Sequence, residues 1–416
     1  MIAGKDPLPK SRWLNKKAAF EMMPTLAKKT HSAVLYYDGQ LDDARYCLAL
    51  AQTASDAGAA VVNHTQVLDF QRVSDGKLSG ATLKNLISGE EFSVKAKIFI
   101  NCTGPAADKI RLLANKNLES RIRPSKGVHL ILPAEVLSSS SAMLIPKTND
   151  GRVVFAIPFE GETLLGTTDN DYATIDQEPI LEKEEVAFLL ETLERYLEKK
   201  PDPKQVQAGY GGLRPLLAAS AGKSTKKLVR DHEVEHDETS NLVSLMGGKW
   251  TTYRLMAQDT IDKIDGIFGK TNLCQTHEKY LVGGENYDFE HWKTLKTNYV
   301  LDDDICQYLM KKYGINAEKV ANLTKNEPNL AKRLSPKYPY IQAEIVYGVQ
   351  EEMACTPRDI LARRMRIEFL DWQMTYDATP QVAEIMAKIL GWNDEQKKQQ
   401  IDNYQADIKI FLKQIS

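Results

Sequence analysis

The stretch that decides the fold is LVSLMGGKWTTYRLMAQDTIDKI, residues Leu242–Ile264. Its apolar start predicts a strand, and its second half repeats apolar residues at helical spacing. Two glycines and a lysine, Gly247–Lys249, stand at the junction, although neither a strand end nor a helix start requires them. Glycines let a ligand approach the backbone closely, and free N–H groups at a helix start, together with a lysine, attract negative charge. We therefore expect something to lie against this junction.

Three interpretations of the Gly-Gly-Lys junction come into question, and the residues leave two of them open. A phosphate loop would need the pattern GxxxxGK[ST], which the stretch does not match. An electron-rich ring edge, such as the pyrimidine end of a flavin that becomes anionic on reduction, would use both the N–H groups and the lysine. The third interpretation is a tight strand-to-helix turn with an exposed lysine.

The composition is that of a soluble globular protein. The chain has 416 residues, 43% of them hydrophobic and 26% charged, and this length suggests two or three domains. The net charge of −2 gives no indication of nucleic-acid binding. The five cysteines form no CxxC or Cys/His pairs, which favours reduced thiols and a cytoplasmic location. The apolar runs are too short to span a bilayer, so any membrane contact is expected to be peripheral.

Changes in the pattern of apolar and turn residues along the chain predict an α/β protein with an added helical domain. Residues 1–120 mix strands with helices, including a helix over 41–58, a β-meander over 59–94 and a strand over 95–104 that its apolar run predicts to be buried. Residues 121–240 read as an antiparallel sheet of short strands joined by Asp-Gly and Glu-Gly turns, interrupted by one helix over 181–199. We expect residues 241–275 to return to the first domain and residues 284–416 to form a helical C-terminal domain.

Several residues in these segments could carry chemistry. INCTGPAAD (Ile100–Asp108) is a second strand that stops at a glycine, so its backbone could also lie close to a ligand. Arg214, between glycines and proline in GYGGLRPL, suits bidentate recognition of a carboxylate or phosphate, although a surface arginine is the simpler alternative. Arg230 and Lys249 are two further cations, and together the three would suit a dianionic substrate.

His129 lies on an apolar strand in SKGVHLILP. A lone histidine there is more often a core residue, but facing the cations it would be a candidate proton acceptor. His232 and His236 lack further ligands nearby, so we expect no metal site there. Three arginines of the C-terminal domain, Arg363, Arg364 and Arg366, read as a charged face packed on acids, with docking onto the other domains or an anionic membrane as alternatives.

Taken in order, these segments resemble the FAD-dependent glycerol-3-phosphate dehydrogenases, which pass electrons to quinone. The resemblance runs from about Tyr36 to the C-terminus. It is carried by YYDGQLDDAR, INCTGP, SKGVHLILP, NDGRVVFAIP, GTTD, GGLRPL, GGKWTTYRLMAQDTID and ACTPRDILARRMR.

The resemblance implies a reaction and a role for each matched residue. A base takes the C2 hydroxyl proton of glycerol 3-phosphate, a hydride passes from C2 to flavin N5, and dihydroxyacetone phosphate results. The implied catalytic residues are His129, Arg214 and Lys249, and the implied substrate-binding residues are Arg230, Arg214, Lys249 and Thr168. The implied FAD contacts are Val67 near the adenine, Thr103 and Gly104 near the diphosphate, and Gly248, Lys249, Trp250 and Thr251 near the isoalloxazine. The resemblance leaves a homodimer and a peripheral contact with the inner face of the cytoplasmic membrane open.

One motif of the resembled family is missing from this sequence. The family begins with a strand, GxGxxG and a helix that seat the FAD diphosphate. The chain contains no such unit, so we expect it to correspond to the family without roughly its first hundred residues, judged from the place of a βαβ unit. The FAD-binding domain is accordingly expected to be incomplete.

This gap keeps several functions in competition. The first is the quinone-linked enzyme, and the second is an FAD-less remnant that acts as a binding or assembly module. A third is an enzyme of the same fold with different chemistry, either an oxidase that passes electrons from glycerol phosphate to oxygen or a relative of the amino-acid oxidases. Flavin absorbance, peroxide production and activity on amines distinguish them.

Overall fold

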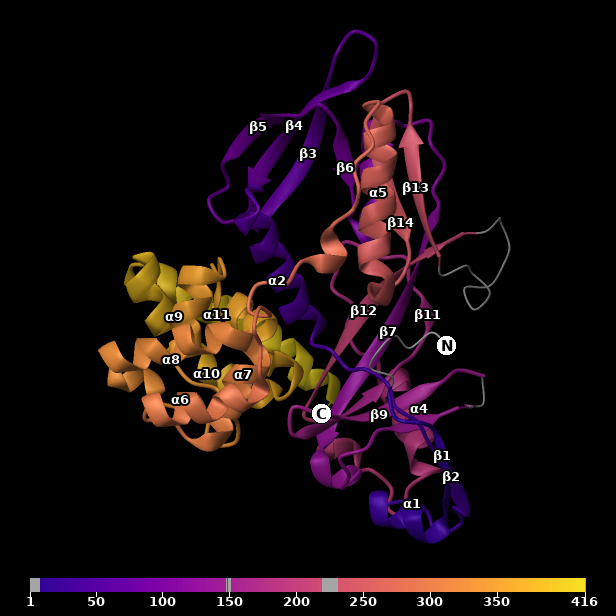
Figure 1. The fold of residues 1–416 in the computed structure, drawn as a ribbon, viewed down its shortest axis with the longest axis vertical. Helices are drawn as coiled ribbons and strands as arrows, with labels where there is room; N and C mark the ends of the chain where they lie inside the picture. The colour runs from indigo at the N-terminus through magenta and orange to yellow at the C-terminus, as the bar shows by residue number, and fades with distance from the viewer. Residues whose placement is uncertain (1–7, 147, 149–150, 219–230, 416) are drawn as a thin grey trace.

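The structure, a computed structural model, describes residues 8–146, 148, 151–218 and 231–415. Figure 1 shows a lower sheet, an upper part that contains the long helix α5 (Tyr253–Ile267), and a cluster of helices to one side. The strands β7 (Ile122–Pro133) and β12 (Ala208–Leu217) run from the lower sheet towards the upper part. The helix α2 (Asp43–Asp56) runs between the upper part and the cluster of helices.

The lower sheet is antiparallel and is organised around β7. One edge of β7 pairs with β12, and the other edge pairs with β10 and β11. The sheet is extended by a β9–β10 hairpin, whose two turn residues Glu160 and Gly161 have φ values of 50° and 85°. This is the positive-φ geometry that a two-residue hairpin turn requires. The other strands are β8 (Met143–Ile145), β9 (Val154–Phe159), β10 (Glu162–Gly166) and β11 (Asn170–Asp171).

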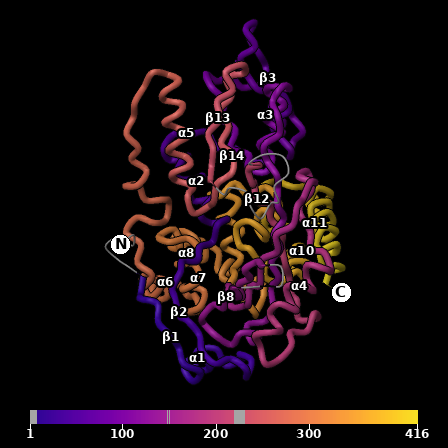
Figure 2. The backbone as a smooth tube through the Cα atoms, turned by 90° about the vertical axis from the view of Figure 1, so that its right-hand side faces the viewer, coloured from indigo at the N-terminus to yellow at the C-terminus, as the bar shows by residue number. Residues whose placement is uncertain are grey.

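The upper part contains two three-stranded sheets. One is the predicted meander of β3 (Thr65–Arg72), β4 (Leu78–Asn85) and β5 (Glu91–Lys95). The other pairs β13 (His232–Asp237) antiparallel with β14 (Leu242–Gly247), and β14 parallel with β6 (Phe99–Asn101). The helices α3 (Ala107–Ala114) and α5 follow β6 and β14, so both glycine-ended strands lead into helices. In the side view, β3 and α3 lie at the top of the molecule (Figure 2).

The prediction of a buried strand at residues 95–104 is wrong. The strand β6 covers only three residues, and within the described residues it pairs with β14 alone. As a result Ile100 is 45% exposed. An apolar run cannot distinguish an edge strand from a central one, because both carry the same residue types.

The base of the molecule and the lower sheet carry four smaller elements. The hairpin-like pair β1 (Arg12–Asn15) and β2 (Ser32–Leu35) flanks α1 (Lys16–Met22), and all three lie at the bottom of both ribbon views (Figures 1 and 2). The helix α4 (Lys183–Glu194) packs on the lower sheet and is shorter than the predicted 181–199.

The C-terminal part is helical, as predicted. Its helices and the lower sheet share one hydrophobic core, which contains Leu130, Ile131 and Trp372. Within the described residues, no helix combines the length and the apolar character needed to cross a bilayer. The helices are α6 (Trp292–Asn298), α7 (Asp303–Tyr313), α8 (Ala317–Asn326), α9 (Ala343–Glu351), the π-helix η10 (Asp359–Arg364), α10 (Trp372–Leu390) and α11 (Asp394–Ile415).

The helix α2 is joined to the helical domain by ion pairs. Arg45 forms a bidentate pair with Glu352, with N–O distances of 2.8 and 2.7 Å. Its guanidinium also lies 4.3 Å from the ring centroid of Tyr313. Asp42, which caps α2 by accepting from the Arg45 N–H, pairs with Lys312 at 2.6 Å. These contacts fix α2 against the helical domain, although none of its own residues is fully buried.

Candidate active site

His129 lies in the middle of β7, where Gly166 on β10 and Tyr210 on β12 are its cross-strand partners. The imidazole stacks on the Tyr210 ring, with centroids 4.9 Å apart and ring planes inclined by 18°. On the other side, a Cβ added to Gly166 would come within 2.7 Å of Cγ and 2.8 Å of Nε2 of His129. The imidazole is therefore confined between a tyrosine ring and a residue that has no side chain.

The surroundings of His129 keep its imidazole neutral. Burial lowers the pKa of His129 to about 4, and the positive charge of Arg214 adds to this effect. Its Nδ1 atom is buried and finds no hydrogen-bond partner among the described residues. A neutral imidazole has one nitrogen that can accept a proton, so His129 meets the first requirement of a general base.

Arg214 lies on the same face of the sheet as His129. Side chains two residues apart along a strand share a face, and Tyr210 and Arg214 are four residues apart on β12. The guanidinium lies over Gly127, where an added Cβ would come within 2.7 Å of Nη1. The Arg214 side chain donates to the Thr167 hydroxyl and the Thr168 carbonyl, at 3.2 and 3.1 Å. The sheet thus brings the predicted base and one predicted cation together.

The turn after β10 holds Arg214 in place, and Thr168 joins this turn to β7 and α4. The Thr168 side chain is 1% exposed, and its hydroxyl accepts from the Val128 N–H and donates to Glu185. Asp169 pairs with Arg214 at 3.4 Å. Thr167, which the sequence analysis did not single out, is the threonine whose hydroxyl meets Arg214. The Thr168 carbonyl also accepts from Arg214 and from the Thr167 hydroxyl, so the polar groups of Thr168 hold this turn and its predicted substrate contact stays a prediction.

The Gly-Gly-Lys junction forms the predicted strand-to-helix turn. Gly247 and Gly248 have φ values of 71° and 84°, which residues with side chains rarely adopt. The Gly248 N–H donates to the Asp231 carbonyl at 3.1 Å, and the Lys249 carbonyl accepts from the Thr252 N–H. Lys249 and Trp250 are exposed at the start of the helix. The turn thus presents a lysine and a helix N-terminus to its surroundings, as expected for a site that binds negative charge.

The second glycine-ended strand is organised by Asn101, which the sequence analysis missed. Its side-chain oxygen accepts from the N–H and the hydroxyl of Thr103, at 3.2 and 2.7 Å. Its amide donates to the Ala107 carbonyl and to Ser244 on β14. Asn101 thus shapes the turn at Thr103–Gly104 and ties it to β14. An asparagine two residues before a threonine is the signal that could have identified this turn.

The short helix η1 (Gly104–Ala106) brings the two glycine-ended turns close to the lower sheet. It contacts β7, β12 and β14. Beneath it, Ala107, Leu217 and Met246 form a small buried cluster with Ile122. The backbone at Gly104 and the strand that ends at Gly247 are therefore packed against the same end of the sheet that carries Arg214.

Of the predicted site residues, Val67 lies away from the two turns, and Arg230 cannot be placed. Val67 is on β3 and packs in the separate core of the meander, with Phe70 and Leu83. Arg230 lies outside the described residues.

Two family models match the chain. One described as "FAD dependent oxidoreductase" matches residues 3–259, and one described as "C-terminal domain of alpha-glycerophosphate oxidase" matches residues 274–397. The first alone covers more than half of the chain. The chain belongs to the FAD-dependent oxidoreductase family. The cofactor of this family is FAD, and the predicted fold class is confirmed.

Relatives of this family member confirm the resemblance seen in the sequence. A probable mitochondrial glycerol-3-phosphate dehydrogenase of Dictyostelium discoideum is 39% identical over 98% of the chain and 66% of its own length. The mitochondrial glycerol-3-phosphate dehydrogenase of Bos taurus is 37% identical over 97% of the chain and 57% of its own length. The crystal structure of the glycerol-3-phosphate dehydrogenase of Bacillus halodurans in complex with FAD matches 98% of the chain and 83% of its own, with 25% identity and a TM-score of 0.82. The chain thus spans 66% and 57% of these two curated relatives' lengths.

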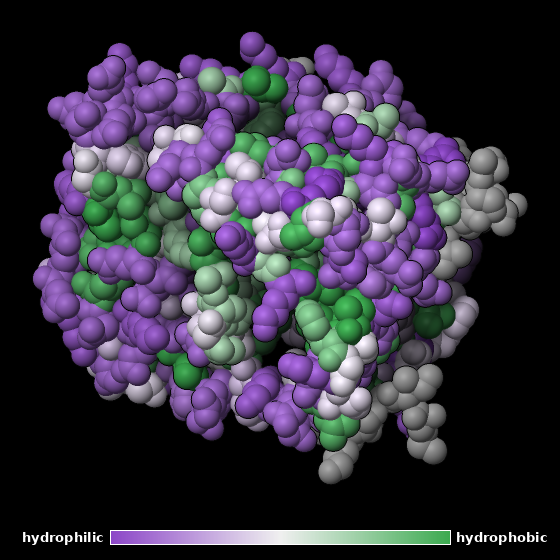
Figure 3. Space-filling model, turned by 90° about the horizontal axis from the view of Figure 1, so that it is seen from above, coloured by the Kyte–Doolittle hydropathy of each residue, from purple (hydrophilic) through white to green (hydrophobic). Residues whose placement is uncertain are grey.

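The residues of this FAD-dependent oxidoreductase fit the cofactor at two turns. A Cβ added to Gly104 would meet nothing within 4 Å, and Thr103 beside it is exposed. At the second turn, Thr251 is exposed and Trp250 is 38% exposed. Accessible backbone at a helix start suits the diphosphate and the carbonyl edge of a flavin. Seen from above, apolar side chains interrupt an otherwise hydrophilic surface (Figure 3), and Leu255 and Ile261 of α5 are 46% and 50% exposed.

A separate cleft lies between the lower sheet and the helical domain. Its volume is about 550 Å³, and its lining includes Glu160, Tyr308 and Lys311. The lining also contains Glu162, which is 5% exposed and pairs with Lys337 at 2.8 Å. None of the predicted site residues lines this cleft. The cleft therefore belongs to the interface between the lower sheet and the helical domain rather than to the candidate active site.

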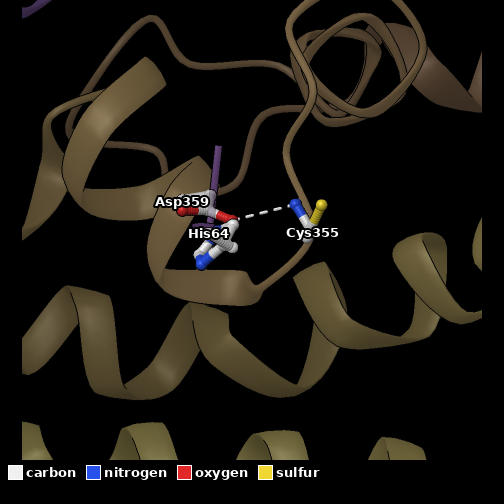
Figure 4. A group of neighbouring side chains, drawn as sticks. All are labelled: His64, Cys355 and Asp359. Carbon is white, nitrogen blue, oxygen red and sulfur yellow. Dashed lines mark hydrogen bonds and ion pairs between the residues drawn. The ribbon is translucent and has the colours of Figure 1, made fainter. Parts of the chain in front are cut away.

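Within the described residues, one group of side chains has the composition of a metal site. His64, Cys355 and Asp359 lie within 4.8 Å of one another by their ligand atoms (Figure 4). The Asp359 Oδ2 atom already accepts from the N–H groups of Cys355 and Thr356 and lies 2.8 Å from His64 Nε2. This carboxylate therefore caps the start of η10 and joins it to the segment before β3.

The three arginines near η10 pack on acids, as the first interpretation of the sequence expected. Arg366 pairs with Asp43 on α2 at 2.9 Å, Arg363 pairs with Glu178 at 3.5 Å, and Arg364 lies 3.8 Å from Asp359. Arg364 and Arg366 are 8% and 7% exposed. The pair between Arg366 and Asp43 also docks the helical domain onto α2.

Proposed function

We propose that this chain takes part in the oxidation of glycerol 3-phosphate to dihydroxyacetone phosphate, with FAD as the hydride acceptor and quinone as the final electron acceptor. The names of the relatives support this substrate. The observation that carries the proposal is the neutral, confined His129 on the same sheet face as Arg214. A secondary alcohol needs a base to release hydride, and a phosphate ester needs fixed cations.

In this proposal each residue of the chain has one task. His129 accepts the proton of the C2 hydroxyl, and Gly166 and Tyr210 hold its ring in position. Arg214 and Lys249 stabilise negative charge near the reacting carbon, while Arg230 binds the substrate phosphate together with them. Bound FAD supplies the acceptor for the hydride that leaves C2.

The proposed cofactor contacts follow the two turns. Thr103 and Gly104 approach the diphosphate with their backbone. Gly248, Lys249, Trp250 and Thr251 approach the isoalloxazine, where N–H groups and a cation favour the anionic reduced ring. Val67 contacts the adenine side, and Thr168 contributes to the substrate pocket by holding the turn that orients Arg214.

The base is tested by replacing His129 with glutamine. We expect kcat to fall by about 100-fold or more, in the range typical of general-base removal, while the flavin content stays unchanged. The measurement is anaerobic reduction of the flavin-loaded protein by glycerol 3-phosphate, followed by absorbance. In the wild type, the low pKa of His129 predicts that the rate is retained down to pH values below the ordinary histidine pKa of 6.5. Retention of kcat in His129→Gln would exclude histidine as the base.

The phosphate contact is tested by replacing Arg230 with alanine. Loss of a charge-assisted hydrogen bond to a dianion costs about 1.5–3 kcal/mol, so KM for glycerol 3-phosphate should rise about 10- to 100-fold. Lys10→Ala, at an exposed lysine near the start of the chain, is the matched control for loss of a positive charge. An unchanged KM in Arg230→Ala would remove this arginine from the proposed pocket.

A binding module without FAD is the second candidate function. It is favoured by the short sheet around β14 and by α2, which has no fully buried residue. Titration of the purified protein with FAD separates the two functions. Quenching of flavin fluorescence with a saturable, stoichiometric end point supports the enzyme, and unchanged fluorescence at high FAD concentration supports the binding module.

The remaining features of the proposal concern the electron acceptor and the place of action. We propose a quinone acceptor, a peripheral contact with the inner face of the membrane, and a homodimer in an otherwise cytoplasmic setting. Peroxide formation with glycerol 3-phosphate would instead identify an oxidase, and activity on amines would identify a relative of the amino-acid oxidases. The names of the curated relatives place them in mitochondria, so co-sedimentation with membranes is the informative localisation experiment.

A further inference from the structure

A continuous stack of side chains connects His129 to the helical domain. The imidazole lies on the Tyr210 ring at 4.9 Å, and the Tyr210 ring meets Phe369 edge-on at 4.7 Å. The guanidinium of Arg366 lies 4.6 Å from the Phe369 ring centroid. We call these four residues the aromatic column. It starts in the lower sheet and ends in the segment between η10 and α10.

The far end of the aromatic column is fixed by charge. Arg366 pairs with Asp43 at 2.9 Å and with Asp42 at 3.5 Å, both at the start of α2. Its φ of 69° is a backbone conformation that costs free energy for a residue with a side chain. The guanidinium is thus placed against Phe369 by its backbone and by two carboxylates.

The near end of the column contains a histidine that no hydrogen bond orients. A functional histidine usually has its ring orientation fixed by a hydrogen bond at the second nitrogen. In His129 the buried Nδ1 has no such partner among the described residues. Packing against Tyr210 and Gly166 is therefore what fixes the ring.

We propose that Tyr210 is the positioning residue for His129, and that Phe369 and Arg366 of the helical domain hold Tyr210 in place. Stacked aromatic rings attract one another beyond the burial of their surfaces, and this attraction favours one orientation of the imidazole. The column also keeps water from one face of the imidazole. The helical domain thereby acts on the candidate active site through contacts rather than by contributing a group to the chemistry.

Charged groups on two elements act on the imidazole besides the column. Arg214 on β12 disfavours its protonated form, and Asp43 on α2 favours it. Burial is nevertheless the largest cause of its low pKa. Because Tyr210 covers a face of the ring, removing the tyrosine ring should let water reach His129, and the pKa should rise towards its ordinary value of 6.5.

The test follows the ring of His129 directly in protein labelled with ¹³C-histidine, with His129→Gln to assign the signal. In Tyr210→Leu we expect the NMR pKa of His129 to rise by one unit or more from about 4. Tyr210→Phe keeps the ring and should titrate like the wild type. Phe369→Leu should give a smaller rise. It also serves as the second variant if Tyr210→Leu does not fold.

The matched control is Phe411→Leu, which removes a ring from the pair of Trp372 and Phe411 elsewhere in the helical domain. A wild-type titration in Tyr210→Leu, or an equal shift in Phe411→Leu, would overturn the positioning role. A kinetic test also depends on the proposed function. In that test we expect kcat for glycerol 3-phosphate to fall about 10- to 100-fold in Tyr210→Leu, with KM nearly unchanged. The expected NMR shifts together with a flavin-loaded wild type that does not turn over glycerol 3-phosphate would support the aromatic column and end the proposed function instead.

Discussion

Replacing Gly166 with alanine is expected to reduce the kcat of the flavin-loaded protein by about 100-fold or more, the cost typical of displacing a catalytic group by about 1 Å. An ideal Cβ at this position would lie 2.7 Å from Cγ and 2.8 Å from Nε2 of His129, well inside van der Waals contact. Tyr210 closes the opposite side of the ring, so the imidazole can only move out of its position. The measurement is the rate of flavin reduction by glycerol 3-phosphate.

The control for Gly166→Ala is Gly266→Ala on α5, where an added Cβ meets nothing within 4 Å. Alanine is a better helix former than glycine, so this variant should retain activity and stability. Overpacking at Gly166 also costs about 1–3 kcal/mol of stability, and thermal unfolding must show that the variant is folded at the assay temperature. A folded Gly166→Ala protein with wild-type kcat would mean that the position of the His129 ring does not limit the reaction.

Replacing Arg45 with alanine is expected to lower the free energy of unfolding by about 3–5 kcal/mol, the cost of leaving a buried charge without its partner. The side chains of Arg45 and Glu352 are 11% and 1% exposed, so water cannot replace the lost guanidinium at Glu352. Denaturant unfolding monitored by circular dichroism gives the change. The loss should be concentrated in the contact between α2 and the helical domain.

Two further variants define the contribution of this pair. Arg45→Met combined with Glu352→Leu removes both charges and keeps the volume, and should recover most of the loss. Lys28→Ala breaks the pair of Lys28 and Glu198, in which the lysine side chain is 85% exposed, and should leave the stability nearly unchanged because water screens an exposed pair. Equal destabilisation in Arg45→Ala and in the double variant would show that the ion pair is not what holds α2.

Much of the fold could be predicted because local signals determine it. The helix predicted over residues 41–58 forms as α2, with Asp42 as its N-cap, and the Glu160–Gly161 turn forms the β9–β10 hairpin. The glycine-ended strand before Lys249 leads into a helix, as its sequence pattern indicated. The position of β6 at an edge could not be predicted, because the neighbours of a strand depend on the rest of the sheet and not on its own residues.

The residue types of the candidate site could be predicted, but the residues that hold His129 and Arg214 in position could not. His129 and Arg214 share one face of the sheet, which follows from strand register that the sequence does not state. Tyr210 lies four residues before Arg214 in the same segment, yet its stacking on His129 requires the pairing of β7 with β12. Arg366 was expected on a charged face packed on acids, and it pairs with acids, but its 7% exposure and its place over Phe369 could not be foreseen. Burial of a charged residue depends on tertiary partners, here Asp42 and Asp43.

The open side of β6 has a consequence for how copies of the molecule meet in solution. Among the described residues it is bonded to β14 alone, so the backbone groups on its other side can act as a template for a strand of a neighbouring molecule. Ile100, which is 45% exposed, adds an apolar side chain to this edge, and the exposed residue Cys102 follows the strand. Self-association along this side is therefore the hazard that a high protein concentration increases.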